Sequence, residues 1–269
     1  MLPIVDKPVI HYVVEELVEA GIEQIVIVTG WHKRAIEDYF DRHLELEAKL
    51  EEAKKIEQLE SIKKISEMAE FVYVRQKEMN GNGGAILCAK NVIGDEPFIV
   101  HWADDFFVAN PSSVKQTITA YNKYGGMILA GFRTKEEEDT FKYGYAVGKE
   151  VSPGILEVDK FVEKPGPGKF ASEGIAIVSA FVFNPDIFFA LERVKKPKGQ
   201  ELVYVDGVNA LMKQGEKAYA VEIKNSRFFD TGNVLSYLKT NVEFALKRKD
   251  IGKDFKKYLA GVAKENGIK

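Results

Sequence analysis

The chain is poor in the residues that build several common kinds of site. Its single cysteine, Cys88, excludes an intramolecular disulfide framework and suits a reducing compartment. Its four histidines lack the spacing of zinc ligands. No apolar run reaches the roughly 18–20 residues that span a bilayer, and no signal-peptide pattern opens the chain. The net charge of −3 gives no overall positive field for nucleic acid. We therefore expect a cytoplasmic protein that binds neither membrane nor nucleic acid.

What the chain does contain is alternating helix and strand patterns in its first half. Residues 9–20 carry apolar side chains at helical spacing and end at a glycine. Short apolar strands are predicted at 24–29, 71–75, 98–102 and 127–132, and a helix at 83–90. Helices between parallel strands, followed by the strand-rich second half, indicate an α/β protein with a doubly wound, Rossmann-like mixed sheet.

The second half is richer in strand patterns. Strands are predicted at 143–147, 155–162, 175–183 and 219–223, with helices at 185–194, 205–213 and from about 231 to 247. No linker, repeat or low-complexity segment interrupts the chain. We predict one domain over residues 1–246 and a basic helical tail over 247–269.

Residues 44–68 differ from their surroundings. They are rich in Glu, Lys, Leu and Ile and contain neither Gly nor Pro, which predicts one or two exposed amphipathic helices inserted between strands. A solvated helical cover is the first interpretation, and a contact between copies of the chain is the alternative. We expect a homo-oligomer.

Carboxylates follow two apolar strands. Asp104 and Asp105 come directly after residues 98–102, and Asp230 ends the apolar run before a Thr-Gly turn and a helix. Ligands of open α/β sheets bind beyond the carboxyl ends of strands, and Mg²⁺ prefers carboxylate oxygens. Asp104 and Asp230 are therefore candidate metal ligands, although Asp230 could be a plain helix cap. We interpret Asp105 as a capping residue, and His101 and Trp102 as packing residues.

A third strand end carries an acid and a base side by side. Glu163 and Lys164 follow the strand at 155–162 and precede Pro165. They could form an exposed surface pair of little energetic weight. In the functional interpretation, Lys164 contacts a phosphate and Glu163 accepts hydrogen bonds from sugar hydroxyls.

A glycine-rich turn follows the strand at 71–75. Gln76 comes first, and Asn80-Gly81-Asn82-Gly83-Gly84 then opens a helix. Glycine lets a planar base approach the backbone closely, and an amide side chain has the donor and acceptor that an imide edge requires. The turn could equally be a simple helix entry, and it is neither GxGxxG nor a P-loop.

Taken in order, these segments resemble the sugar-1-phosphate nucleotidyltransferases, and among them the bacterial-type UTP–glucose-1-phosphate uridylyltransferases. The resemblance runs from residue 1 to about 246. The matching segments are MLPIVDKPVIHYVVEELVEAGIEQIVIVTG, YVRQKEMNGNGGAILCAK, GDEPFIVHWADD, VEKP and FFDTGNVLSYLKTNVEFAL.

The resemblance implies a role for each candidate residue. Asp104 and Asp230 would hold Mg²⁺, and the substrates would be UTP and glucose 1-phosphate, with UDP-glucose as product. The uracil would meet Gln76 and Gly81. The remaining contacts would be those of Gly144 and Glu163 with the glucose hydroxyls, and of Lys164 with the glucose 1-phosphate.

The chain also departs from the family pattern. Ala103 stands where the family usually has Gly or Pro before the metal-binding Asp. Gly84 stands in place of a usual His, and Gly174 in place of a usual Asn. The family's first strand and its Gly-rich GxGTR loop precede the segment that opens this chain. The strand would lie between those at 24–29 and 98–102, so we expect an open slot there and little UTP turnover by the chain as written.

Two other functions stay open. The related thymidylyltransferases share the Asp, EKP and DTG features, but the VRQ and VEFAL segments and the insertion from residue 44 favour the uridylyl group. A non-catalytic subunit that binds or assembles around a sugar nucleotide is the third possibility.

Overall fold

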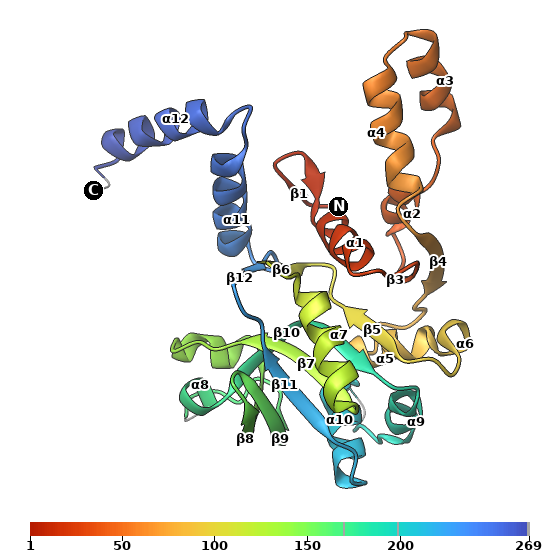
Figure 1. The fold of residues 1–269 in the computed structure, drawn as a ribbon, viewed down its shortest axis with the longest axis vertical. Coiled ribbons are helices and arrows are strands. Elements are labelled where there is room, and N and C mark those ends of the chain that lie inside the picture. Colours follow the sequence, from red (N-terminus) through yellow and green to blue (C-terminus); the bar gives the residue numbers. More distant parts are fainter. Residues whose placement is uncertain (169, 198, 268–269) are drawn as a thin grey trace.

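The computed structural model describes residues 1–168, 170–197 and 199–267. Figure 1 shows a lower part built around a β-sheet and two helical projections that rise above it, α3–α4 on one side and α11–α12 on the other. The mixed α/β class predicted from the sequence is confirmed.

A six-stranded sheet forms the centre of the lower part. Its strand order is β5-β10-β7-β11-β9-β8, in which β7 and β11 run parallel and the other neighbours antiparallel. Every residue of β10 is buried, as expected of a strand with neighbours on both edges and layers on both faces. The strands are β5 Phe98–His101, β7 Met127–Phe132, β8 Gly144–Ser152, β9 Ile155–Val162, β10 Ile175–Phe183 and β11 Ala218–Glu222.

The strands are divided where the sequence predicted an open slot, between residues 24–29 and 98–102. Strands β3 (Gln24–Thr29) and β4 (Glu70–Arg75) form a separate parallel pair, while β5 pairs antiparallel with β10. Within the described residues, β3 pairs only with β4 and β5 only with β10, so β3 and β5 share no hydrogen bonds. Apolar runs predict that strands exist but not which edges meet, because either edge can pair with any complementary strand.

Two shorter pairs complete the strands. β6 (Asp105–Ala109) runs antiparallel to β12 (Ser226–Asp230), and β1 (Pro3–Ile4) to β2 (Lys7–Pro8). The β6–β12 register places Asp105 opposite Asp230. Two acidic segments more than a hundred residues apart in the chain are thereby brought to one point.

Helices cover both faces of the central sheet because its strands alternate their apolar side chains. In β7, Ile128 and Ala130 face the cluster that contains α7, whereas Met127 and Leu129 face the cluster that contains α9 and α10. The helices are α1 Val9–Glu19, α2 Arg34–Phe40, α5 Asn82–Cys88, α6 Lys90–Ile93, α7 Ser113–Tyr124, α8 Phe170–Glu173, α9 Asp186–Arg193, α10 Tyr204–Lys213 and α11 Val234–Lys247, with the 3₁₀ helix η1 at Glu137–Phe141. The sequence reasoning missed α7 and β6.

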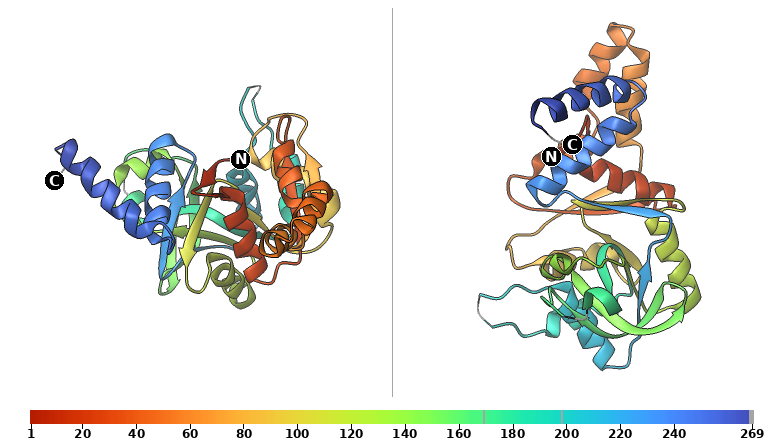
Figure 2. Two further views of the ribbon diagram at one scale, coloured as in Figure 1. Left: turned by 90° about the horizontal axis from the view of Figure 1, so that it is seen from above. Right: turned by 90° about the vertical axis from the view of Figure 1, so that its left-hand side faces the viewer.

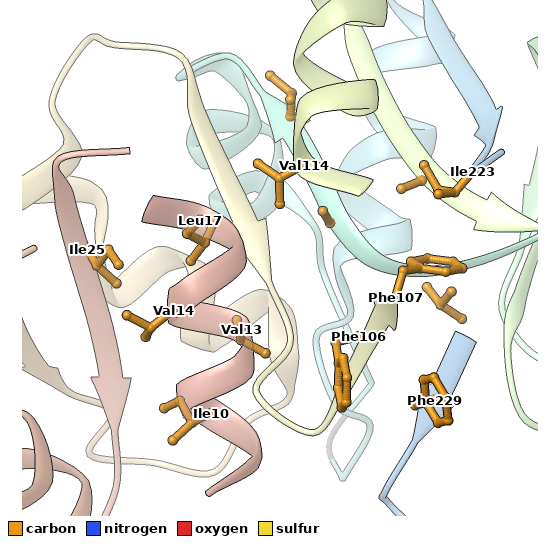
Figure 3. Packing of buried hydrophobic residues seen from close by; sticks show 14 of the residues in the cluster. Ile10, Val13, Val14, Leu17, Ile25, Phe106, Phe107, Val114, Ile223 and Phe229 are labelled. Atoms are coloured by element: carbon orange, nitrogen blue, oxygen red, sulfur yellow. The ribbon is translucent and has the colours of Figure 1, made fainter. Parts of the chain in front are cut away.

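Helix α1 carries the predicted apolar stripe into the first cluster. Figure 3 shows its Val13 on the side toward Phe106 of β6 and its Val14 on the side toward Ile25 of β3, and Ile10 and Leu17 belong to the same cluster. Burial of each such aliphatic side chain contributes about 1.5–3 kcal/mol. This packing fixes the β6–β12 pair, and with it the acidic residues at its end.

Helices form both projections. The inserted segment forms the hairpin of α3 (Leu44–Glu52) and α4 (Ile56–Ser66), and the tail forms α12 (Gly252–Glu265). Figure 2 shows both projections standing clear of the sheet. Across 1–168, 170–197 and 199–267, every helix is too short or too polar to cross a membrane.

Candidate functional site

A backbone clamp brings the two candidate metal ligands together. The backbone N–H and the hydroxyl of Thr231 both donate to the carbonyl of Asp104, at 2.9 and 2.7 Å. The N–H of Gly232 donates to Asp230 Oδ1 at 2.7 Å and fixes that carboxylate. Thr231 is buried, so water does not compete for these hydrogen bonds.

The two carboxylates converge on one small volume. A Cβ atom built at Gly232 would lie 3.1 Å from Asp230 Oδ1 and 3.5 Å from Asp104 Oδ2. Burial, and then the charge of Asp230, raise the pKa of Asp104. A shared cation would relieve both effects.

The donor set fits Mg²⁺ better than a metal held by protein alone. No group of three or more His, Cys, Asp or Glu side chains converges on a metal position in the part of the chain that the structure describes. Mg²⁺ is commonly held by one or two carboxylates together with substrate phosphates and water. Asp104 and Asp230 fit that pattern.

Tyr143 connects the carboxylate pair to the sugar-phosphate candidates. Its hydroxyl donates to Asp230 Oδ2 at 3.1 Å, and its carbonyl accepts from the N–H of Lys164 at 3.2 Å. Lys164 has a positive φ of 45°, which turns its half-exposed side chain out of the strand direction. A non-glycine residue in this region is uncommon and often marks a functional position.

Gly144 makes room for the carboxylate of Glu163. A Cβ at Gly144 would lie 2.9 Å from the ring of Phe161 and 3.1 Å from Glu163 Oε2. Burial raises the pKa of Glu163, opposed by the nearby charge of Lys164 at 3.9 Å. Gly144, Glu163 and Lys164 therefore lie together in one corner of the site.

The predicted nucleobase residues form a second corner. Gln76 Nε2 donates to the carbonyl of Gly81 at 3.1 Å, and Gly81 has a φ of 101°. A Cβ at Gly81 would lie 2.3 Å from the carbonyl of Leu202, so only glycine fits. The segment before α10 thus packs directly against the turn.

One interpretation of a buried polar residue is wrong, and another is incomplete. Asp105 caps no helix in the described part of the chain: it opens β6, its Oδ1 is buried with no hydrogen-bond partner there, and burial raises its pKa to about 7. His101 does more than pack, because its Nε2 lies 3.0 Å from the hydroxyl of Ser179 and 3.6 Å from Glu16 Oε2. Trp102 does pack, against Phe181 and other rings.

The structure thus places the candidate residues in three groups. These are the carboxylate pair, the corner with Glu163 and Lys164, and the corner with Gln76 and Gly81. Sequence reasoning missed Thr231, which clamps the pair, and Tyr143, which joins the pair to the Lys164 corner. A threonine directly after Asp230 was visible in the sequence, but its partner is a carbonyl 127 residues away. Tyr143 gave no signal beyond its place before a strand.

A model of the family described as nucleotidyl transferase matches residues 1–246. The chain belongs to the nucleotidyl transferase family. Among curated members, UTP–glucose-1-phosphate uridylyltransferase of Bacillus subtilis (strain 168) is 41% identical over 268 residues, which cover 100% of this chain and 90% of that protein. A Staphylococcus saprophyticus protein, UTP–glucose-1-phosphate uridylyltransferase 1, is 42% identical over 98% of this chain and 91% of its own length. The predicted kinship with this branch of the family is confirmed.

Solved structures of family members agree with the fold. UTP-bound UGPase from Acinetobacter baumannii superposes with a TM-score of 0.86 at 32% identity, over 97% of this chain and 90% of that one. A UDP-glucose pyrophosphorylase complexed with UDP-glucose gives a TM-score of 0.81 at 38% identity, over 92% and 90%. A glucose-1-phosphate thymidylyltransferase from Bacillus anthracis, at 18% identity and a TM-score of 0.67, shares the fold alone.

Proposed function

We propose that the protein transfers a uridylyl group from UTP to glucose 1-phosphate and releases pyrophosphate. A phosphate oxygen of glucose 1-phosphate attacks the α-phosphorus of UTP in line, the new P–O bond forms, and the bond from the α-phosphorus to the pyrophosphate oxygen breaks. UDP-glucose is the second product. Little covalent chemistry falls to the protein, so positioning and charge stabilisation would account for the rate.

Asp104 and Asp230 would hold Mg²⁺. When bound, the ion would neutralise phosphate charge and orient the two reactants. The hydrogen bond from Tyr143 holds Asp230 Oδ2, and the N–H of Gly232 holds Oδ1, so this carboxylate is oriented before any cation binds.

The two corners would bind the two ends of the product. Lys164 would contact the phosphate of glucose 1-phosphate as a point charge, and Glu163 would accept hydrogen bonds from glucose hydroxyls in the space that Gly144 leaves open. Gln76 would meet the imide edge of uracil, and the backbone at Gly81 would lie against the ring.

The convergence of Asp104 and Asp230 is the observation that carries this proposal. The carboxylates of Asp104 and Asp230 lie beside Gly232, and Thr231 holds the two segments together. Keeping both charged costs free energy unless a cation or a ligand binds them. The names of relatives at 41% and 42% identity favour UTP and glucose 1-phosphate as the substrates.

A pyrophosphate-release assay tests the proposal. We expect Mg²⁺-dependent release with UTP and glucose 1-phosphate, and its loss in the folded variants Asp104→Asn and Asp230→Asn. A wild type that prefers dTTP would support thymidylyl transfer instead. Binding of UDP-glucose without any pyrophosphate release would support the non-catalytic subunit.

We also propose that the protein acts as a cytoplasmic homo-oligomer. Apolar side chains on α11 support this, because Leu235 and Leu238, three residues apart on the helix, are 62% and 55% exposed. Contiguous exposed apolar surface commonly marks a contact between proteins.

A further inference from the structure

The amide of Gln76 is held in one orientation. Its Nε2 donates to Asn80 Oδ1 at 2.9 Å and to the carbonyl of Gly81 at 3.1 Å. An amide nitrogen has two hydrogens, so both are used, and Oε1 receives no hydrogen bond from the described part of the chain. If the amide were flipped, Gln76 Oε1 would face two oxygen acceptors. One of them is the Gly81 carbonyl, which cannot exchange oxygen for nitrogen as a side-chain amide can. Gln76 therefore presents an acceptor, not a donor, to a ligand.

Asn80 is fixed in turn by Gly84. A Cβ built at Gly84 would lie 1.8 Å from Asn80 Oδ1 and 2.5 Å from Asn80 Cγ. The side chain of Asn80 thus lies flat on the backbone at the start of α5, in space that any other residue at position 84 would occupy. Asn80 and Gly84 form a matched pair.

The backbone of the turn is anchored on its outer side. The carbonyl of Asn80 accepts from the N–H of Leu202 at 2.8 Å, and the N–H of Gly83 donates to the carbonyl of Leu202 at 2.9 Å. Asn82 Oδ1 accepts from the N–H of Tyr204 at 2.9 Å and caps α10. The acceptor on Asn80 is consequently held relative to β4, which ends just before Gln76.

We propose that Asn80, seated on Gly84, is the positioning residue that makes this site select a nucleobase with a ring N–H donor. The inference rests on the proposed function, which places uracil at Gln76. Uracil and thymine carry an imide N–H that Gln76 Oε1 accepts. Cytosine has an unprotonated ring nitrogen at that position, and two acceptors would then face each other without a hydrogen.

Removal of Asn80 would free Gln76 to rotate. With one acceptor fewer around Nε2, a turned amide could donate to the cytosine ring nitrogen, so discrimination would weaken more than affinity. A site built around a fixed hydrogen bond discriminates strongly, and one with a rotatable amide does not. The Kd ratio of CDP-glucose to UDP-glucose is the quantity that reports the role of Asn80.

The test measures Kd values for UDP-glucose, CDP-glucose and dTDP-glucose by calorimetry on the full chain. We expect the wild type to bind UDP-glucose about 100-fold more tightly than CDP-glucose. Asn80→Ala should lower this ratio about tenfold, the scale of one hydrogen bond, while the Kd for UDP-glucose changes only a few-fold. Gly84→Ala should do the same, because its Cβ displaces Asn80.

Two further variants separate this role from a merely structural one. Asn80→Asp keeps the acceptor oxygen and should keep the ratio, while Met79→Ala, at a neighbouring position that is 96% exposed, should leave every Kd unchanged. Circular dichroism and thermal unfolding verify that each variant is folded.

The outcomes distinguish the two proposals. A folded Asn80→Ala that keeps the wild-type ratio would overturn the role of Asn80 and leave uridylyl transfer intact. A wild type that binds dTDP-glucose as well as UDP-glucose, yet rejects CDP-glucose, would support selection of a base with a ring N–H. A wild type that binds no nucleotide sugar would overturn the proposed function and this inference together.

Discussion

Tyr143 shows how a single residue can join parts of the site that are distant in sequence. Its hydroxyl reaches Asp230 Oδ2, and its carbonyl receives the N–H of Lys164. A movement of Asp230 at the end of β12, or of Lys164 after β9, would therefore move the other through Tyr143. Side chains that hold a metal ligand commonly change metal affinity or activity 10–100-fold when altered.

We predict that Tyr143→Phe raises the Mg²⁺ concentration for half-maximal activity at least about tenfold, because Asp230 loses a donor that orients it. The measurement is pyrophosphate release over a Mg²⁺ titration. Tyr145→Phe is the matched control, since the Tyr145 hydroxyl is buried with no hydrogen-bond partner in the described residues. Equal Mg²⁺ requirements in wild type and Tyr143→Phe would contradict the role of Tyr143.

We predict that Lys164→Ala raises the KM for glucose 1-phosphate about tenfold or more and that for UTP much less. The loss of one charge-assisted contact to phosphate is the physical reason. Steady-state kinetics with each substrate varied in turn measure both constants. Equal effects on the two substrates would mean that Lys164 is structural or belongs to the nucleotide side.

At the scale of elements, a buried polar network ties four segments together beneath the site. Glu16 on α1 accepts from the hydroxyl and N–H of Ser113, at 2.6 and 2.7 Å, and so holds the first turn of α7. Its other oxygen faces His101 at the end of β5, and His101 contacts Ser179 on β10. Such a buried pair is costly to break by removing one partner.

We predict that His101→Gln destabilises the fold by about 3–5 kcal/mol near pH 5.5 and by progressively less as the pH rises above about 6.5. Burial opposes protonation, but the carboxylate of Glu16, 3.6 Å from Nε2, outweighs it and raises the pKa of His101. A raised histidine pKa contributes stability that is complete below the unfolded value of about 6.5 and is lost as the pH rises through the folded value.

The carboxylate of Glu16 sets the lower pH limit of the range in which this pair stabilises the fold. Burial alone would raise the pKa of Glu16, but His101 and Ser113 lower it, so its contribution is lost as the pH falls below about 4.3. Urea unfolding of wild type and His101→Gln at several pH values measures the difference. His32→Asn, at an exposed position with positive φ, is the control. A difference that stays constant with pH would refute the pairing.

On the scale of the whole molecule, the two helical projections leave apolar side chains uncovered. Leu44 on α3 is 65% exposed, and Val234 on α11 is 77% exposed. Figure 1 shows α3–α4 and α11–α12 rising from opposite sides of the molecule. These exposed apolar side chains could be covered by a second copy of the chain or by another protein.

We predict an oligomer whose mass falls toward that of the monomer in Leu238→Glu, because a charge on the exposed apolar side of α11 opposes its burial. Light scattering after size-exclusion chromatography measures the mass. Lys239→Glu places the same charge on the adjacent exposed position and should leave the mass unchanged. A monomeric wild type would contradict the proposal.

Local patterns predicted most of the regular structure. Strands Gln24–Thr29, Met127–Phe132, Ile155–Val162 and Ile175–Phe183 begin and end where their apolar runs do. The composition of residues 44–68 predicted one or two helices, and α3 and α4 lie there. Helix α7 was missed because its apolar positions are few and polar residues separate them, so its burial depends on contact with the sheet.

The sequence alone determined which residues sit at strand ends and which family they resemble, because strand ends and glycine turns are local properties of the chain. Only the tertiary structure decided which ends meet. It pairs β6 with β12, clamps Asp104 through Thr231 and seats Asn80 on Gly84. Strand pairing and side-chain contact depend on complementary surfaces that come together only when the chain folds.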